Sequence, residues 1–298
     1  MKALARAILT GVRSLLDADP AVRLRGRRIL TLEVLKRVRT ELTFRRQGFL
    51  WTGAAASSIT QSIYVDEHYQ DAHMGPMVEW LKANTAFSRP VIVNVGANLG
   101  DVVLPLTRTG KRVVAVEPNP ETFARLERNV RQNGLSDRVT CCNVAIAASA
   151  GTAELVTASD AGNSEINEPG GRLGFDGVDQ RAGVVAVKTV RLDDLLASLG
   201  VTPDQVALVW SDTQGFESQV IESATALWKN GVPLWVEIWP KGLICHGGVP
   251  RFLDLCRQHF RSLFPETRFD GKPEPITALE PIVARLKGAE FTDVLLIP

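Results

Sequence analysis

A glycine-containing turn follows the apolar run that begins after residue 90. The sequence VIVNVGANLGD at 91–101 predicts a strand that leads through Gly96 and Gly100 into the start of a helix. Glycine lets a ligand approach the backbone where a Cβ would collide, and the first N–H groups of the helix would face electronegative atoms of that ligand. Asn98 stands where dinucleotide enzymes carry the second glycine of the GxGxxG pattern, which disfavours NAD. The turn predicts a ligand site, with a plain tight turn between strand and helix as the alternative.

Two polar strand ends would border the same ligand. Glu117 and Pro118 follow the predicted strand 112–116, and an acid there can accept hydrogen bonds from both hydroxyls of a ribose. Such charge-assisted bonds contribute roughly 1.5–3 kcal/mol each. Asn143 lies in the predicted strand 139–147, whose end would border adenine. The alternatives are a solvated acid at Glu117 and an ordinary polar strand end at Asn143.

Six short motifs resemble, in this order, the FkbM family of S-adenosylmethionine-dependent methyltransferases. They are VNVGANLGD at 93–101, AVEPNP at 115–120, NVAIA at 143–147, RLDDLL at 191–196, SDTQGFE at 211–217 and WVEIWP at 235–240. The resemblance covers about residues 60–298. It implies that S-adenosylmethionine is the cofactor and that the protein is an O-methyltransferase. The acceptor it implies is a hydroxyl of a sugar or of a natural product such as a polyketide.

The resemblance also implies a role for individual residues. The glycine turn would line the methionine part of the cofactor, the acid after the second strand would hold the ribose, and the third strand end would lie near adenine. The cofactor-binding set is Asn94, Gly96, Ala97, Asn98, Gly100, Glu117, Pro118 and Asn143.

Three positions depart from the pattern of the family. Asn94 stands where many relatives carry Asp, so a negative charge near the cationic cofactor is missing and binding would be weaker. Gln214 stands where Glu is frequent, which removes a charge from the acceptor side. Trp210 is bulky and precedes the acceptor-side acid, so it would reshape the acceptor pocket.

Methyl transfer to a hydroxyl needs a base beside the methyl group. The cofactor supplies the reactivity, while the protein aligns the reactants and removes a proton. Asp212, at the end of the predicted strand 206–211, is placed for this, with a helix N-cap as its alternative role. Glu237 lies between two tryptophans, so it would have a raised pKa or bind a sugar hydroxyl. Glu217 would contact the substrate or stabilise the start of a helix.

Two histidines and one polar loop complete the candidate site. His68 precedes the predicted domain and His246 follows the fifth strand, and each is a further candidate base or a plain surface residue. The polar loop 157–183 is expected to act as a lid over the acceptor. Asn163 and Ser164 are its expected substrate contacts, and a mobile surface loop is the alternative.

Strands that alternate with helices after residue 90 predict an α/β fold. We expect a Rossmann-like class I methyltransferase fold, with a mainly parallel seven-stranded sheet covered by helices on both faces. Residues 1–86 would form a mostly helical N-terminal extension or cap, and residues 87–298 the methyltransferase domain. Within the extension, residues 1–46 are expected to be helical and residues 47–65 to form short strands. The expected strands of the domain are 91–95, 112–116, 139–147, 151–156, 184–189, 206–211, 233–238 and 294–297, and the expected helices include 120–133, 192–199, 216–228 and 250–260.

Charge and cysteine content restrict the partners. The net charge of the chain is +1, which gives no reason to expect nucleic acid, although residues 1–50 hold twelve Lys or Arg and only four acids. This basic region would dock a partner, a membrane surface or a phosphorylated substrate, or else form a solvated cap that helps a homo-oligomer to assemble. The four cysteines form no CxxC pair, so we expect no metal and a cytoplasmic enzyme. No run of 18 apolar residues exists, so no transmembrane segment is expected.

Two other functions remain open at this point. A nucleotide-binding oxidoreductase would share the glycine turn and the acid after the second strand. A catalytically inactive relative would bind the cofactor but methylate no small-molecule hydroxyl acceptor, and Asn94 and Trp210 keep this reading open.

Overall fold

The chain divides into two compact units. The computed structural model describes residues 20–66, 69, 71–84, 88–158, 165–167, 181–265 and 272–298. The units are Met1–Tyr69 and Gln70–Pro298, whereas the sequence placed a domain boundary between residues 86 and 87. None of the described helices is long and apolar enough to cross a membrane.

The described part of the first unit combines two helices with a hairpin. Its elements are α2 (Pro20–Val38), β1 (Glu41–Arg46), β2 (Phe49–Ala54) and α3 (Ser58–Val65). Strands β1 and β2 are antiparallel and are joined by Gln47 and Gly48, which have positive φ values of 51° and 80°. Two such residues form the tight turn that fits the twist of a hairpin. The small core of this unit is formed by Leu32, Leu42 and Ala55.

Two predictions for this unit are wrong. Residues 41–46 form a strand instead of continuing a helix, because the two-residue turn pairs them with β2. Residues 58–65 form helix α3 instead of a strand, because Ser57 caps the helix by accepting a hydrogen bond from the backbone of Thr60.

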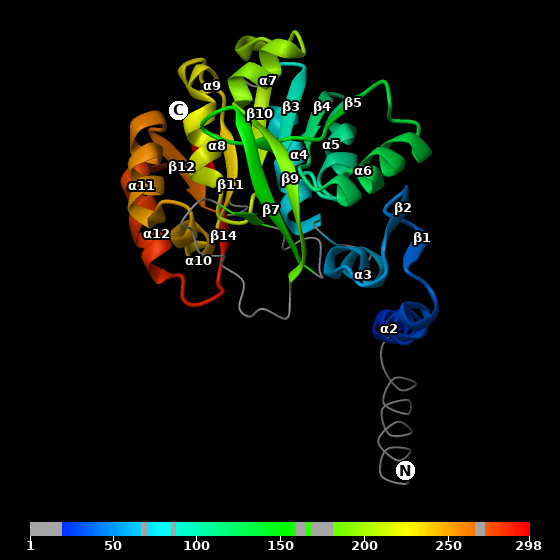
Figure 1. The fold of residues 1–298 in the computed structure, drawn as a ribbon. Helices are drawn as coiled ribbons and strands as arrows, with labels where there is room; N and C mark the ends of the chain where they lie inside the picture. Colours follow the sequence, from blue (N-terminus) through cyan, green and yellow to red (C-terminus); the bar gives the residue numbers. More distant parts are fainter. Residues whose placement is uncertain are drawn as a thin grey trace. The chain divides into compact units, whose positions relative to one another are not determined.

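The second unit is built on a mainly parallel sheet (Figure 1). The strand order is β13-β12-β14-β11-β10-β3-β4-β5. The five strands from β11 to β5 are parallel, and the others run antiparallel at one edge. Six of these eight strands match strands expected from the sequence, whereas β12 and the two-residue β13 were not expected, and the expected strands 151–156 and 184–189 lie in another sheet. The bounds are β3 (Val91–Val95), β4 (Arg112–Val116), β5 (Val139–Cys142), β10 (Val206–Ser211), β11 (Leu234–Ile238), β12 (Ser262–Pro265), β13 (Glu274–Pro275) and β14 (Thr292–Ile297).

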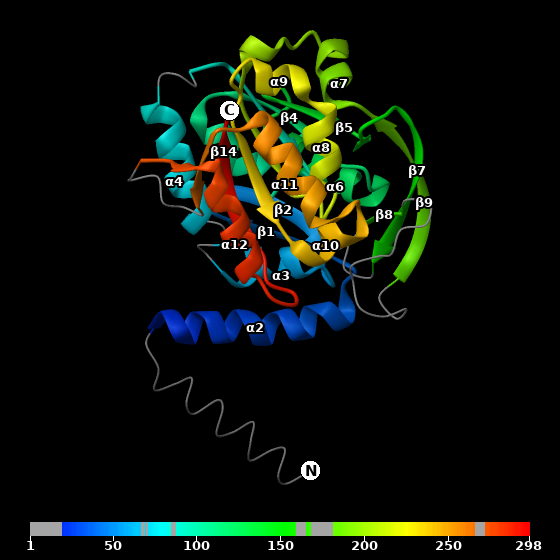
Figure 2. The ribbon, with the colours of Figure 1, turned by 90° about the vertical axis from the view of Figure 1, so that its left-hand side faces the viewer.

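Helices cover both faces of this sheet. Figures 1 and 2 show α4, α5 and α6 on one side, and α8, α9 and α11 on the other. The helices are α4 (Asp71–Ala83), α5 (Val103–Leu106), α6 (Pro120–Gln132), α7 (Leu192–Ser198), α8 (Glu217–Ser223), α9 (Thr225–Lys229), α10 (Pro240–Cys245), α11 (Gly248–His259) and α12 (Leu279–Arg285). Short 3₁₀ helices span Thr107–Thr109, Pro203–Gln205 and Ile276–Ala278. The predicted helix 216–228 is divided at Ala224 into α8 and α9.

The central strands are apolar because both of their faces are buried. Val93, Val209 and Val236 pack with Phe252 of α11 in one continuous core. A sheet covered on both faces has near-continuous apolar strands instead of alternating ones. Because these apolar runs are uninterrupted, the strand bounds expected from the sequence lie close to the observed ones.

Figure 2 shows a second sheet to one side of the first, and its strand order is β6-β9-β7-β8. Its strands are β6 (Ala145–Ile146), β7 (Gly151–Ala158), β8 (Glu165–Asn167) and β9 (Arg181–Val190). The predicted strand 139–147 is therefore divided. Its first half, β5, pairs with β4 in the main sheet, while its second half, β6, pairs with β9.

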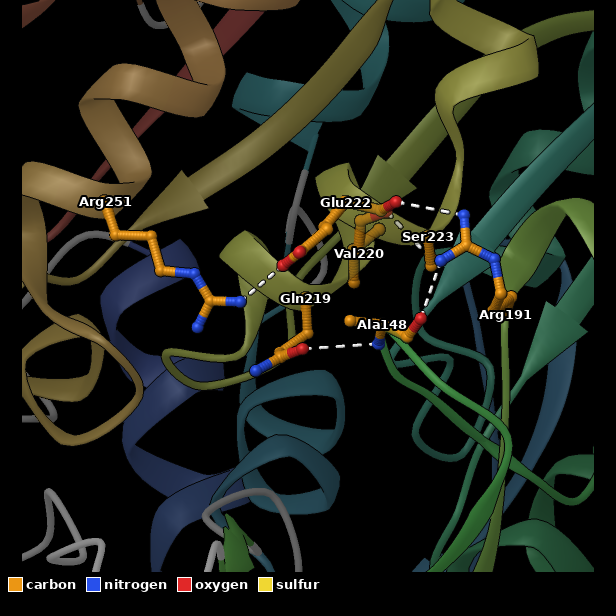
Figure 3. Close-up of polar contacts among 7 residues, drawn as sticks. All are labelled: Ala148, Arg191, Gln219, Val220, Glu222, Ser223 and Arg251. Atoms are coloured by element: carbon orange, nitrogen blue, oxygen red, sulfur yellow. Dashed lines mark hydrogen bonds and ion pairs between the residues drawn. The ribbon is translucent and has the colours of Figure 1, made fainter.

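Polar contacts tie helix α8 to its surroundings (Figure 3). Arg191 donates to the carbonyl oxygens of Ala148, at 2.6 Å, and Glu222, at 3.1 Å. The side chain of Gln219 accepts from the backbone N–H of Ala148 at 3.2 Å. Glu222 also forms an ion pair with Arg251 of α11. These contacts fix the helix whose first turn contributes to the candidate site.

Candidate functional site

The glycine turn after β3 lies directly against the end of β10. The N–H groups of Gly96 and Ala97 donate to the carbonyl oxygen of Val116, at 3.0 and 2.9 Å. Gly96 has φ +84°, and a Cβ there would overlap the backbone carbonyl oxygen of Asp212. The N–H of Asp212 in turn donates to the carbonyl of Val95 at 3.1 Å. The predicted cofactor turn and the predicted base thus lie side by side.

Asn98 and Gly100 shape the rest of this turn. Asn98 has φ +46°, a left-handed conformation that Asn tolerates better than most residues, and its side chain accepts from the N–H of Leu99 at 2.7 Å. Gly100 has φ +100°, and a Cβ there would lie 2.9 Å from Leu104 and 3.1 Å from Leu126. The turn therefore admits α5 and α6 close beneath it only because a glycine occupies this position.

Glu117 is buried at the end of β4 and holds two backbone segments. Its Oε2 accepts from the N–H of Asn98 at 2.9 Å, and its Oε1 accepts from the N–H of Asn119 at 2.8 Å. Burial raises the pKa of Glu117 to about 7, the charges of Asp101 and Asp212 add to the rise, and the two N–H groups oppose it. Each carboxylate oxygen can accept a further hydrogen bond, so hydroxyl groups of a ligand can still bind here.

Asn143 supports the segment that carries Glu117. Its side-chain amide donates to the backbone carbonyls of Glu117, at 2.8 Å, and Pro118, at 3.0 Å. Asn143 is exposed and Pro118 is half-buried. The structure brings both residues to the predicted site, and their contact with adenine stays a prediction.

Asn94 is fully buried in the middle of the sheet. Its Nδ2 donates weakly to the carbonyl of Trp210 at 3.4 Å, while its Oδ1 has no hydrogen-bond partner among the described residues. The ring of Trp210 stacks on Trp235, with 4.8 Å between the ring centroids. Trp210 is therefore a packed core residue under the strand ends, and its effect on the shape of an acceptor pocket stays a prediction.

Asp212 and Glu237 form a carboxyl pair at the ends of two neighbouring strands. Strands β10 and β11 are parallel, with Ser211 opposite Val236, so both acids emerge at the same edge. Each of the two side chains shifts the pKa of the other. The amide of Gln214 donates to Asp212 at 2.8 Å and to Glu237 at 3.3 Å.

Burial raises the pKa values of both acids in this pair. Burial and the charges of Asp212, Glu217 and Asp293 raise the pKa of Glu237 well above its ordinary value. Two carboxyl groups this close do not both ionise readily, so the pair can hold one proton and accept another.

Glu217 holds the turn between β10 and α8. Its Oε1 accepts from the N–H and the hydroxyl of Thr213, at 2.9 and 2.8 Å, and from the N–H of Gly215 at 3.3 Å. Burial raises the pKa of Glu217 to about 7. Its side chain is buried and engaged with the backbone, so it shapes the turn, and its contact with a substrate stays a prediction.

Two glycines bring this turn against the loop after β11. Gly215 has φ +101°, and a Cβ there would overlap the backbone of Gly242 in α10. A Cβ on Gly242 would in turn overlap the ring of Trp239 and approach the carbonyl of Gln214 to 2.9 Å. The loops that carry Gln214 and Trp239 are therefore in direct contact.

Of the candidate histidines and loop residues, His246 is the one that the structure describes. His246 is 1% exposed and meets the ring of Phe216 edge-on, with 5.0 Å between centroids. His246 is thus closed off from solvent, contrary to the expectation of a loop residue at the active edge. His68, Asn163 and Ser164 lie outside the described residues.

Sequence reasoning missed Asp101. This residue is buried after the glycine turn, and burial together with the charge of Asp212 raises its pKa to about 7. Its place at the start of a helix is typical of an ordinary capping acid, which hides the signal. With Glu117, Asp212, Glu217 and Glu237 it makes the site strongly acidic. No group of three His, Cys, Asp or Glu within the described ranges is arranged to hold a metal ion.

Known proteins resemble this chain over its central part. Residues 94–239 match the model of the methyltransferase FkbM domain. The 2-O-methyltransferase NoeI of Sinorhizobium fredii is 29% identical over 141 residues, which are 44% of this chain and 56% of NoeI. A probable cobalt-precorrin-6B C(15)-methyltransferase (decarboxylating) of Methanothermobacter thermautotrophicus is 42% identical over 50 residues, 17% of this chain and 26% of that protein. The chain thus spans about half the length of the first relative and about a quarter of the second.

Solved structures resemble it more distantly. TYW2 of M. jannaschii in complex with AdoMet is 12% identical with a TM-score of 0.46, covering 87% of this chain and 86% of that one. A methyltransferase FkbM from Methylobacillus flagellatus is 14% identical with a TM-score of 0.40, covering 94% of this chain and 62% of that one.

Proposed function

We propose that the chain transfers a methyl group to a hydroxyl oxygen, because residues 94–239 match the model of the methyltransferase FkbM domain. The cofactor of this family is S-adenosylmethionine. The proposed acceptor is a small molecule, either a sugar or a glycosylated or polyketide natural product. The relative NoeI, named as a 2-O-methyltransferase, supports oxygen as the target.

One observation carries this proposal. The backbone of Asp212 lies so close to Gly96 that no Cβ fits between them. The charge of Asp212 also raises the pKa values of Asp101 and Glu117, which flank the glycine turn. A carboxyl group able to accept a proton is therefore held beside the turn that would bind the cofactor.

The site residues fit a cationic nucleoside. Gly96 and Gly100 leave the backbone of the turn without side chains, and Glu117 has oxygens available to ribose hydroxyls. The buried acids have raised pKa values because no solvent stabilises their charge. A positive ligand would stabilise them. The unpartnered oxygen of Asn94 can accept a bond that a cationic ammonium donates.

The chain's own residues would then perform two tasks. Bound S-adenosylmethionine supplies a methyl group on a positively charged sulfur. The turn and Glu117 would fix its position, which is the main contribution that a protein makes to such a displacement. Asp212 would take the proton of the acceptor hydroxyl as its oxygen bonds to the methyl carbon. A hydroxyl needs this help more than an amine, which is consistent with an acidic acceptor side.

Calorimetric titration tests the proposed cofactor. We expect micromolar binding of S-adenosylmethionine and S-adenosylhomocysteine and none of NAD. Glu117→Gln should weaken binding at least tenfold, since it removes a charge-assisted acceptor. Glu127→Gln on the exposed face of α6 is the matched control and should bind like the parent protein.

An acceptor screen then tests the reaction. Sugars and glycosylated natural products would be incubated with S-adenosylmethionine labelled on its methyl group. Label recovered as a methyl ether supports the proposal. Tight cofactor binding with no transfer to any hydroxyl would instead indicate an inactive relative, and failure to bind the cofactor would remove the proposal.

A further inference from the structure

Gln214 is held in an unusual backbone conformation between Asp212 and Gly215. Its φ is +55°, in the left-handed region that is unfavourable for a residue with a Cβ. The turn is kept in place by Glu217, which accepts hydrogen bonds from the residues on both sides. The close contact of Gly215 with Gly242 fixes it from the other direction. The surroundings therefore impose the direction in which this side chain leaves the backbone.

The side chain points at two acids. The amide nitrogen of Gln214 lies 2.8 Å from Oδ1 of Asp212 and 3.3 Å from Oε2 of Glu237. Both neighbours offer carboxyl oxygens, so the nitrogen, which carries two N–H groups, is the end of the amide that can satisfy both. A carboxylate at this position would accept only, and would add a charge to an already acidic site.

These two bonds are unequal. The shorter bond to Asp212 favours negative charge there, because hydrogen bonds to a charged acceptor are stronger. Glu237 receives the weaker bond and also faces Glu217 and Asp293, whose charges disfavour its ionisation. Asp212 in turn faces Asp101 and Glu117 across the glycine turn. The geometry thus makes Asp212 easier to ionise than Glu237, although the two acids are close enough to compete for one proton.

We propose that Gln214 is a positioning residue whose amide keeps Asp212 as the carboxylate and leaves the shared proton on Glu237. The use of this arrangement rests on the proposed methyl transfer. There the acceptor oxygen bonds to the methyl carbon, the carbon–sulfur bond breaks with its electron pair moving to sulfur, and the hydroxyl proton passes to Asp212. Glu237 keeps its proton throughout.

Carboxyl titration by NMR tests this without cofactor or acceptor. The full chain would be labelled with ¹³C at the Asp and Glu carboxyl carbons, and the two signals assigned from Asp212→Asn and Glu237→Gln. We expect Asp212 to titrate at lower pH than Glu237 in the parent protein. In Gln214→Met the Asp212 midpoint should rise by about one unit, since a charge-assisted bond is lost. In Gln214→Glu it should rise further.

Two comparisons keep the test decisive. Gln258→Glu, on the exposed face of α11, adds the same charge elsewhere and should leave both midpoints unchanged. Gln214→Glu has the size of the native residue, so it replaces Gln214→Met if the latter does not fold. An unchanged Asp212 midpoint in the Gln214 variants, or a Glu237 that ionises first, would overturn the proposal. A parent protein that fails to bind S-adenosylmethionine would instead count against the proposed function, while the titration would still report on Gln214.

Discussion

At the scale of single residues, a comparison of two glycines with similar backbone angles distinguishes the cost of backbone strain from the cost of a steric clash. Gly96 and Gly110 have φ values of +84° and +79°, but only at Gly96 would a Cβ meet the backbone of another strand end. Around Gly110 the space within 4 Å is open. The pair allows the cost of a left-handed alanine to be measured apart from the cost of the collision.

Gly110→Ala should lower the free energy of unfolding by about 1 kcal/mol and leave cofactor binding intact. Gly96→Ala should cost roughly 2 kcal/mol more and abolish binding, because Asp212 and the turn must move apart. Urea unfolding and calorimetry measure both quantities. Equal losses in the two variants would show that the close approach of Asp212 has no energetic weight.

Buried acids make stability depend on pH in an unusual direction. Asp101, Glu117 and Glu217 have pKa values raised to about 7, against an ordinary value near 4 in the unfolded chain. Between these values the folded state binds more protons than the unfolded state, so its stability falls as pH rises from about 4 to about 7 and then levels off. The loss is roughly 3 to 4 kcal/mol per group at most.

Glu117→Gln removes one of these groups. We expect it to reduce the decline in urea midpoint between pH 5 and pH 8, while Glu127→Gln keeps the parent profile. If the urea midpoint declines equally in Glu117→Gln and in the parent protein, the pKa of Glu117 is not raised by folding and the prediction is wrong.

At the scale of elements, the contacts of Arg191 show how α8 is held in place. Arg191 is half-buried and bonds two backbone carbonyls, one beside the second sheet and one on α8 (Figure 3). Arg257 is exposed and bonds Asp254 and Glu280 at the surface. Exposed ion pairs contribute little, whereas lost bonds to buried carbonyls are costly.

Arg191→Met should therefore lower the unfolding free energy by about 2 kcal/mol, and Arg257→Met by less than about 1 kcal/mol. Because α8 carries Glu217, Arg191→Met should also weaken cofactor binding. Chemical unfolding and calorimetry on both variants decide this, and a larger loss in Arg257→Met would refute it.

The sequence located elements whose signal is local. Strands β3, β4 and β10 are short apolar runs that end before a glycine or an acid, so they can be recognised without knowledge of their neighbours in the fold. The break between β5 and β6 has no local mark, because it depends on which neighbour each half pairs with. Strand β1 was also missed, although the two-residue turn at Gln47 and Gly48 that pairs it with β2 is local. Helices α10 and α12 are short, so their periodicity is too brief to detect.

The candidate site was predictable in part. The turn at Gly96 and the acid Glu117 follow from spacing along the chain. The role of Gln214 does not, because it depends on a backbone angle and on two acids from different strands. Asp101 was missed because its burial comes from tertiary packing.

At the scale of the whole molecule, every described residue of the candidate site belongs to the unit Gln70–Pro298. We therefore expect a chain that begins at residue 70 to bind S-adenosylmethionine with the affinity of the full protein. Calorimetry on the shortened chain checks this, with Glu117→Gln in the same background as the negative control. A tenfold or greater loss of affinity would mean that the unit Met1–Tyr69 contributes to the site.

The contact between Gly215 and Gly242 limits how the loops after β10 and β11 can change. Under the proposed function the loops after β10 and β11 would border the acceptor, so they are the natural targets for altering acceptor choice by randomisation. Neither loop can gain a side chain at these glycines unless the other retreats. A library that varies one loop alone should consist mostly of misfolded proteins, whereas libraries that vary both together, or keep both glycines, should retain the fold. New acceptors would then arise by paired changes instead of by single steps.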